Sequence, residues 1–191
     1  MAPHNARRRA PHTSAAGSAR AGVTTYAPDM AAGEGASAPK PTVRMSEDEA
    51  WDLLARSING ILTTLRSDGR PVALPVWFVA LDHMIYVQTR GKKIVRARND
   101  SRASFLVEAG ERWAELHAVH LDCHAEVIEP DAELRRRISD AMDTKYAAYR
   151  TARAAMPSAT REHYSNAGQA TIVLTPQGKL LTWDNRKLSL G

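Results

Sequence analysis

The chain lacks the residues and runs that are typical of exported and membrane proteins. Its 191 residues contain a single cysteine, Cys123, which excludes an internal disulfide and fits a reducing compartment. No apolar run approaches the ~18 residues of a membrane span. The three arginines at 7–9 are not followed by the apolar stretch that a secretion signal needs. We therefore expect a cytoplasmic protein without a membrane partner.

Several common nucleotide and metal signatures are also absent. A triphosphate-binding loop needs Ser or Thr directly after Gly-Lys, but Lys93 follows Gly91-Lys92 in this chain. Tyr86 stands where that loop has its first glycine. No dinucleotide fingerprint, paired-cysteine zinc motif or metalloprotease helix motif occurs. Any cofactor site must therefore be built in another way.

Net positive charge is scarce outside the first segment of the chain. Residues 1–44 hold six Lys or Arg against two Asp or Glu, which is +4 of the formal net charge of +5. The other 147 residues carry only +1. Binding of nucleic acid by counterion release needs basic charge spread over a docking face, so no nucleic-acid partner is expected for the folded part. A separate hypothesis is that the chain binds nucleic acid through the arginines of residues 1–44.

Composition divides the chain into residues 1–44 and residues 45–191. The first segment is rich in Ala, Pro, Gly, Ser and Thr and has few large apolar side chains to bury, which predicts a disordered tail. A translation start at Met30 or Met45 is an equally simple explanation of this segment. Residues 45–191 carry regular apolar patterns and are expected to form one cofactor-binding domain.

Local patterns predict a mainly β domain with peripheral helices, of the α+β class. Ser46-Glu47-Asp48-Glu49 is a capping box that begins a helix, and Asn59-Gly60 is expected to end it in a left-handed turn. The tight turn Ser67–Arg70 predicts a hairpin, and seven or so mostly antiparallel strands with few helices indicate a small barrel. The segments expected to be strands are 61–66, 72–79, 84–89, 103–107, 113–128, 170–174 and 179–184.

Two further helices are predicted. One covers about residues 91–99, where apolar side chains lie among basic ones that cannot all be buried. The other opens at Pro130-Asp131 and is expected, with residues 150–168, to shape a substrate pocket. The apolar stripe of this second helix is predicted to contain Leu134, Ile138, Ala141, Met142 and Tyr149.

The segment 89–102 concentrates the positive charge of the predicted domain. Six of the thirteen residues from Arg90 to Arg102 are basic. A strand that passes through Gly91 into a helix start offers unpaired amides and the positive end of the helix dipole, which suits a phosphate. Lys92 and Lys93 would add ammonium charge. An ordinary solvated helix face has the same composition, so both interpretations stay open on these residues alone.

Histidines and the cysteine are grouped at 117–124. His117, His120 and His124 would align on a helix, but in a strand His117 faces away from the other two, so no metal site is expected. Cys123 faces away from His124 and is expected to be a small buried residue rather than a nucleophile.

Three tryptophans lie on predicted strands and could stack on a planar cofactor. Aromatic residues on strands are more often part of the core, and we expect this for Trp77, Trp113 and Trp183 taken singly. Only the combination with the basic segment favours a role in cofactor binding.

The order of these features resembles a known family. Residues 60–78 resemble the opening hairpin of the pyridoxamine 5'-phosphate oxidase-like family, which includes flavin- and deazaflavin-dependent oxidoreductases. Lys93 corresponds to the last lysine of a basic pair that precedes a short helix in this family. Asp100 and Arg102 stand in the expected places after that helix, and the likeness continues to Ile128 and resumes over 174–188.

The resemblance implies a split β-barrel of the FMN-binding type, which is a homodimer with a cofactor at each subunit interface. Lys93 would bind the cofactor phosphate, and backbone of residues 74–77 would lie beside the ring. The cofactor would be FMN or a deazaflavin coenzyme of the F-420 type, which the residues do not separate. The other residues expected at the cofactor are Thr89, Arg90, Gly91, Lys92, Leu74, Pro75, Val76, Trp77 and Trp183.

The implied activity is that of an oxidoreductase acting on a small conjugated substrate, with the redox work done by the ring and no dedicated acid or base named. The C-terminal segment 181–188 lacks the long arginine- and histidine-bearing motif of true pyridoxamine-phosphate oxidases, so the likeness does not extend to their substrate. The alternative within this fold is a non-catalytic flavin- or haem-binding module. In that case His117, His120 or His124 would be candidate axial ligands.

Overall fold

The computed structural model describes residues 42–166 and 168–188. Most of the predicted disordered tail, residues 1–41, lies outside the described residues. Its last part, residues 42–44, runs beside the C-terminal strand, where the Val43 carbonyl accepts a hydrogen bond from the Asp184 amide at 2.7 Å. None of the described helices is long and apolar enough to cross a bilayer.

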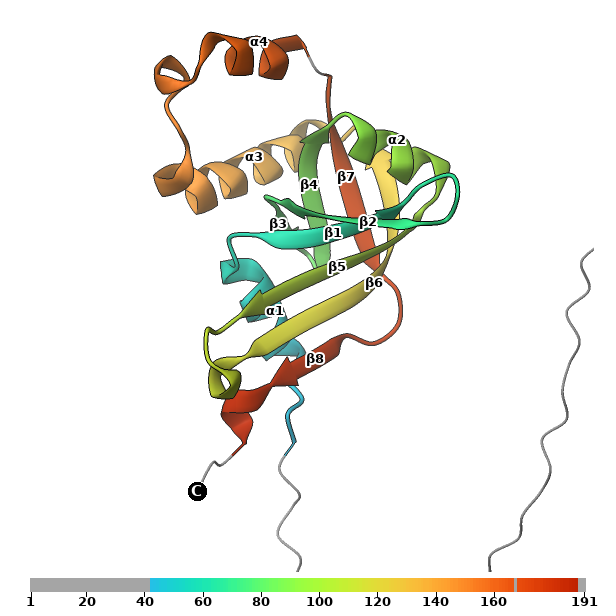
Figure 1. Ribbon diagram of the computed structural model, residues 1–191, viewed down its shortest axis with the longest axis vertical. Helices are drawn as coiled ribbons and strands as arrows, with labels where there is room; N and C mark the ends of the chain where they lie inside the picture. The colour runs from blue at the N-terminus through green and yellow to red at the C-terminus, as the bar shows by residue number, and fades with distance from the viewer. Residues whose placement is uncertain (1–41, 167, 189–191) are drawn as a thin grey trace, which may run out of the picture. The chain divides into compact units, whose positions relative to one another are not determined.

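Eight antiparallel strands form one curled sheet, and this confirms the predicted mainly β class (Figure 1). The strand order is β2-β1-β5-β6-β7-β4-β3, and β8 pairs with β6. The long strand β6 pairs first with β5 and then, from Cys123 onward, with β7, which curls the sheet into a half-barrel. The strands are β1 (Gly60–Leu65), β2 (Pro71–Val76), β3 (Val79–Leu81), β4 (Met84–Arg90), β5 (Arg102–Ala109), β6 (His117–Ile128), β7 (Gln169–Pro176) and β8 (Leu181–Asp184).

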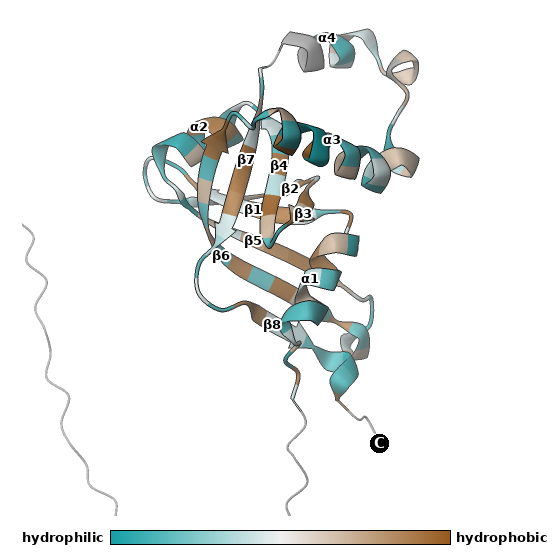
Figure 2. Cartoon of the chain, turned by 180° about the vertical axis from the view of Figure 1, so that it is seen from behind, coloured by the Kyte–Doolittle hydropathy of each residue, from teal (hydrophilic) through white to brown (hydrophobic). Residues whose placement is uncertain are grey.

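Helices flank this sheet. In Figure 2, α3 shows mostly hydrophilic colour while β7 is largely hydrophobic, as expected when strands supply the core. The α-helices are α1 (Glu47–Arg56), α2 (Lys92–Asn99), α3 (Ala132–Tyr146) and α4 (Ser158–Asn166). The short 3₁₀ turns are η1 (Trp113–Glu115), η2 (Ala147–Tyr149), η3 (Arg153–Ala155) and η4 (Asn185–Lys187).

The first helix begins as predicted but ends differently. Its capping box is present, because the Ser46 amide donates to Glu49 Oε2 at 2.6 Å and the Glu49 amide donates to Ser46 Oγ at 3.2 Å. The predicted left-handed stop at Asn59-Gly60 is wrong. Ser57 ends the helix instead, because its amide and its hydroxyl both donate to the Leu53 carbonyl, at 3.0 and 2.7 Å. Gly60 is needed for another reason, since a Cβ there would lie 2.1 Å from the ring of Phe105.

The strand predicted from residue 113 begins later, at His117. Residues Trp113–Glu115 form η1, in which the Glu115 amide donates to the Arg112 carbonyl at 2.8 Å. Gly110 has φ +101°, and a Cβ there would lie 2.4 Å from the Glu115 carbonyl oxygen. The chain therefore turns so tightly between Gly110 and Glu115 that the residues just before His117 cannot pair with β5.

The apolar stripe of α3 ends at a different tyrosine from the one predicted. Tyr149 lies beyond the helix in η2 and is 55% exposed, so its assignment to the stripe is wrong. Tyr146 completes the stripe instead and is fully buried. Both residues lie at helical spacing from Met142, and the end of α3 at Tyr146 decides between them.

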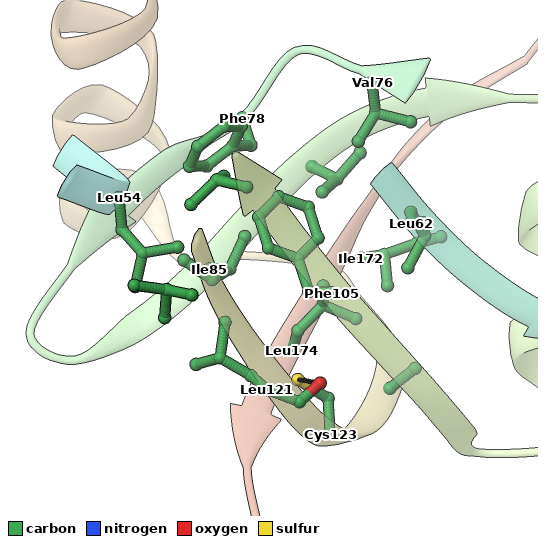
Figure 3. Close-up of a cluster of buried hydrophobic side chains, with 14 of the residues drawn as sticks. Leu54, Leu62, Val76, Phe78, Ile85, Phe105, Leu121, Cys123, Ile172 and Leu174 are labelled. Atoms are coloured by element: carbon green, nitrogen blue, oxygen red, sulfur yellow. Dashed lines mark hydrogen bonds between the residues drawn. The ribbon is translucent and has the colours of Figure 1, made fainter. Parts of the chain in front are cut away.

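The main core fills the inside of the half-barrel. Figure 3 shows side chains from α1, β1, β4, β5, β6 and β7 pointing toward one another, with the rings of Phe78 and Phe105 in edge contact at a centroid distance of 4.8 Å. Along β6, Leu121 and Cys123 are buried and His124 faces away, as the alternation predicts. Burial raises the pKa of the Cys123 thiol to about 12, so the thiol stays protonated and unreactive.

The prediction that the three strand tryptophans belong to the core is wrong. Trp77 is 38% exposed, Trp113 is 59% exposed and Trp183 is 51% exposed. Trp77 follows the end of edge strand β2, Trp113 lies in η1, and Trp183 lies on β8, which among the described strands pairs with β6 alone. Positions at a sheet edge leave large rings uncovered, which makes them available to a ligand or a partner.

Candidate functional site

A cleft of about 430 Å³ lies where the ends of β2 and β4 meet α2, α3 and the start of β7. We call it the Lys93 cleft. It brings together six of the ten predicted cofactor residues, from two separate parts of the sequence, 75–77 and 89–93. Its described lining is Pro75, Val76, Trp77, Gln88, Thr89, Arg90, Lys93, Met142, Arg150 and Gln169.

Four predicted residues are not part of this lining. Leu74 belongs to β2, where it is the register partner of Leu62, and it does not line the cleft. Gly91 and Lys92 are exposed beside the cleft. Trp183 lies on β8, which pairs with the opposite end of β6 from β7.

The turn from β4 into α2 decides which lysine faces the cleft. Gly91 is the N-cap residue with φ +68°, a left-handed conformation that favours glycine and redirects the chain into the helix. Lys92 and Lys93 then differ by about 100° around the helix axis. Lys93 is half-buried at the cleft, and Lys92 is exposed. Of the basic pair found in the sequence, only Lys93 therefore lines the cleft.

Positive charge dominates the lining. Arg90, Lys93 and Arg150 are its charged side chains, and no described residue of the lining is acidic. Arg90 Nη2 donates to Gln169 Oε1 at 2.9 Å, and their backbones are register partners in β4 and β7. Arg150 Nη1 lies 2.5 Å from Asp143 Oδ1, outside the lining. This donor set fits an anionic group such as a phosphate.

Trp77 forms an aromatic wall of the cleft and stacks on the buried ring of Tyr146 behind it. The rings of Trp77 and Tyr146 are 4.3 Å apart at the centroids and within 9° of parallel. The Tyr146 hydroxyl accepts a hydrogen bond from the Phe78 amide at 2.8 Å and lies 2.9 Å from the Ile58 carbonyl, to which it can donate. Burial raises the pKa of Tyr146 to about 12, which keeps the phenol neutral. Trp77 is thus held against a fixed, buried partner.

Sequence analysis missed two residues at this site. Arg150 lies in an irregular segment beyond α3, and nothing local connects it to the phosphate motif. Tyr146 was missed because Tyr149 was assigned to the stripe. Its spacing of four from Met142 was the available signal, since Met142 lines the cleft and Tyr146 stacks on Trp77 of the same lining.

The histidines of β6 lie outside the cleft. His117 is on the core side and its Nδ1 is 2.6 Å from the Glu115 carbonyl, whereas His120 and His124 point to the other face. Within residues 42–166 and 168–188, no three His, Cys, Asp or Glu side chains are grouped as metal ligands.

A larger groove of about 680 Å³ lies near the start of α1 and the β3–β4 turn. Its charged side chains are of mixed sign, because Glu47 and Asp82 are negative and Lys179 is positive. It contains none of the predicted site residues. The smaller Lys93 cleft is therefore the better candidate for a phosphorylated ligand.

Comparison with known proteins agrees with the fold. The family model described as pyridoxamine 5'-phosphate oxidase matches residues 46–177, more than half of the chain. No curated protein is significantly similar to the chain. A conserved hypothetical protein of Mycobacterium tuberculosis has a similar solved structure, with 28% identity and a TM-score of 0.64 over 78% of this chain and 91% of that chain.

Two more distant structures share the fold alone. A FAD-binding protein of Mesorhizobium loti is 18% identical with a TM-score of 0.54, over 72% of this chain and 94% of that chain. The heme storage protein HutZ of Vibrio cholerae is 16% identical with a TM-score of 0.55, over the same shares. The half-barrel thus has the split-barrel fold of these two structures, as predicted. With its family model matched over 46–177, the chain belongs to the pyridoxamine 5'-phosphate oxidase family.

Proposed function

We propose that the chain is an oxidoreductase that binds a flavin-type cofactor, FMN or a deazaflavin coenzyme of the F-420 type, in the Lys93 cleft. The observation that carries this proposal is the convergence of three cationic side chains and an indole ring in one cleft of about 430 Å³. Arg90, Lys93 and Arg150 provide the charge for a phosphate, and Trp77 provides an apolar wall for a planar ring.

The roles of the lining residues follow from their chemistry. The Lys93 ammonium binds the phosphate as a point charge, and Arg90 is held toward the same region by Gln169. Trp77, fixed by its stack on Tyr146, limits the position of the ring and excludes water from one side. A bound flavin or deazaflavin would supply the hydride chemistry.

Proton transfer is not assigned to a carboxylate or an imidazole. The described residues of the lining include no Asp, Glu or His. The redox step is therefore left to the ring, while the protein binds, orients and desolvates the reactants. This matches an enzyme for a small conjugated substrate that enters beside the ring.

We further propose that the protein is a homodimer, because the outer face of the sheet carries a mostly apolar row whose two ends are exposed. Strand register aligns neighbours across four strand pairs, from β2 to β8. The row is Pro75, Ile61, Leu106, His120 and Leu181. Leu181 is 69% exposed, and Trp183 two residues on is 51% exposed. Trp183 lies outside the cleft of its own chain, so in this proposal it contacts the cofactor of the other subunit.

The dimer is tested by a charge placed in this row. Leu181→Asp buries a carboxylate in the proposed interface and is expected to convert a dimer into a monomer in sedimentation velocity. Val95→Asp is the matched control, because Val95 is 54% exposed on α2 and does not belong to the row. A wild-type protein that sediments as a monomer at micromolar concentration would contradict the dimer.

Cofactor binding is tested by titrating the purified protein separately with FMN and with the deazaflavin coenzyme, followed by cofactor fluorescence. One of the two is expected to bind, and Lys93→Ala is expected to weaken it about 10- to 100-fold, the value of one charged hydrogen bond. Lys92→Ala is the control, because this neighbouring lysine is exposed and does not line the cleft. Equal losses in both variants would refute the assignment of Lys93.

The alternative is a binding module that holds its cofactor without turnover. In that case the bound cofactor would keep its oxidation state when candidate substrates are added, although the titration succeeds. Haem is less well supported than flavin, because none of the described residues that line the cleft is a histidine. If haem addition gave a Soret band that was lost in His120→Ala or His124→Ala, haem would be better supported than flavin.

A further inference from the structure

A second cleft, on the other side of α3, has no part in the proposed cofactor site. It has a volume of about 490 Å³ and lies among α1, β3 and α3. We call it the Lys145 cleft. Its lining is mostly small and apolar, and Lys145 and Asp140 are its titratable side chains. The described lining is Ala55, Val79, Ala80, Asp140, Ala141, Thr144 and Lys145.

The Lys145 amine has few polar contacts for a charged group. Nζ lies 3.4 Å from the Leu54 carbonyl oxygen and 3.9 Å from the centroid of the Phe78 ring. Within the described part of the chain it forms no ion pair with a carboxylate. Asp140 does not neutralise it, because Asp140 Oδ2 is 3.1 Å from Arg136 Nη1. The amine is thus half-buried, with one weak acceptor, the ring of Phe78 and, at 5.7 Å, the ring of Tyr146.

This environment favours the neutral amine. Burial lowers the pKa of Lys145 from 10.5 to about 8. At pH 7.5 about a quarter of the molecules would then carry a neutral amine, against about a thousandth for a lysine that titrates at 10.5. A neutral amine is the nucleophilic form, and desolvation in an apolar pocket is a known way to activate lysine.

We propose that Lys145 is a covalent-modification site, at which a small apolar aldehyde enters the Lys145 cleft and forms an imine with the amine. The Nζ lone pair attacks the carbonyl carbon, so a C–N bond forms and the carbonyl oxygen takes a proton. The carbinolamine then loses its hydroxyl and the remaining N–H proton as water, and a C=N bond results. The step needs no oxidant or reductant and is reversible. It does not depend on the proposed cofactor.

The test is reductive trapping on the full chain. The protein is incubated with butanal and cyanoborohydride at pH 7.5, and the alkylated lysines are identified by peptide mass spectrometry over time. Lys145 is expected to be alkylated on the order of tenfold faster than Lys92 and Lys179, which are exposed. The ratio of its rate to that of the exposed lysines is expected to fall as the pH is raised above about 8, where the Lys145 amine is already mostly neutral. In 6 M urea the preference is expected to disappear.

Two results would overturn the proposal. One is alkylation of Lys145 at or below the rate of Lys92 and Lys179 in the folded protein. The other is a preference for Lys145 that persists in urea, because the reactivity would then not come from the cleft. Lys145→Arg keeps the positive charge and is expected to remove the first adduct, whereas Lys179→Arg is expected to leave it unchanged.

Discussion

The Lys93 cleft and the Lys145 cleft share one helix and place the same kind of side chain in opposite surroundings. Met142 of α3 lines the first cleft, and Lys145, less than one turn later, lines the second. Lys93 is accompanied by two arginines and two glutamines. Lys145 is accompanied mostly by alanines, a valine and the ring of Phe78, and the one carboxylate of its lining, Asp140, is paired with Arg136.

This difference shows how the neighbours of a lysine decide its use. Side chains that can hydrogen-bond, together with further positive charge, leave an ammonium ready to bind an anion. An apolar wall disfavours the ammonium and releases the amine as a nucleophile. Tyr146 stands between the two, since its ring stacks on Trp77 of the first cleft and Lys145 Nζ lies 5.7 Å from the centroid of the same ring.

The largest expected effect comes from a change to Tyr146, whose ring lies between the two clefts. Tyr146→Phe deletes a fully buried hydroxyl and leaves the Phe78 amide and the Ile58 carbonyl without this partner. We expect a loss of about 2–3 kcal/mol in the free energy of unfolding, measured in urea. Tyr149→Phe, at a tyrosine that is 55% exposed, is expected to change it little. Equal stabilities of the two variants would contradict the hydrogen-bonded role of Tyr146.

A matched pair of lysine replacements sharpens the comparison. Lys145→Met removes a poorly solvated charge and is expected to raise the free energy of unfolding at pH 7 by about 1 kcal/mol. Lys93→Met is expected to leave stability nearly unchanged and to weaken cofactor binding. Urea unfolding and cofactor titration of both variants check this. Equal changes in the free energy of unfolding for the two variants would contradict this difference between the clefts.

A smaller effect is expected in the dependence of stability on pH. The pKa of Lys145 is about 8 in the folded protein, against 10.5 in the unfolded chain, so between these values the unfolded chain binds the extra proton and stability rises with pH. The difference in the free energy of unfolding between Lys145→Met and wild type should therefore shrink from pH 8 to pH 10. Cys123 and Tyr146, whose pKa values are raised, oppose this rise in both proteins and cancel in the difference. A difference that is constant with pH would argue against the lowered pKa.

Much of the fold was predictable because local chemistry specifies it. The capping box at Ser46 and the turn at Ser67–Arg70, with Gly69 at φ +80°, depend only on neighbours in sequence. The alternation along β6 placed Cys123 inside and His124 outside for the same reason. The end of α1 was missed because Ser57 ends the helix by donating to the Leu53 carbonyl. Gly60, which had indicated a later stop, is required instead by its fit against Phe105, a residue 45 positions away in the chain.

The site was predictable in part. The basic segment indicated Lys93, and the resemblance indicated Pro75 to Trp77, all of which line the Lys93 cleft. Arg150 and the Trp77–Tyr146 stack depend on how α3 packs across the sheet, which no local pattern encodes. The exposure of Trp183 likewise comes from the position of β8 in the sheet, so its proposed role depends on the second subunit.

The most direct test of the central proposal is a crystal structure of the protein with FMN or with the deazaflavin coenzyme bound. We expect the cofactor phosphate within hydrogen-bond distance of Lys93 Nζ and the ring beside Trp77 and the end of β2. Cofactor density in the groove near Trp51 and His83, or in the Lys145 cleft, with the Lys93 cleft empty, would contradict the proposal.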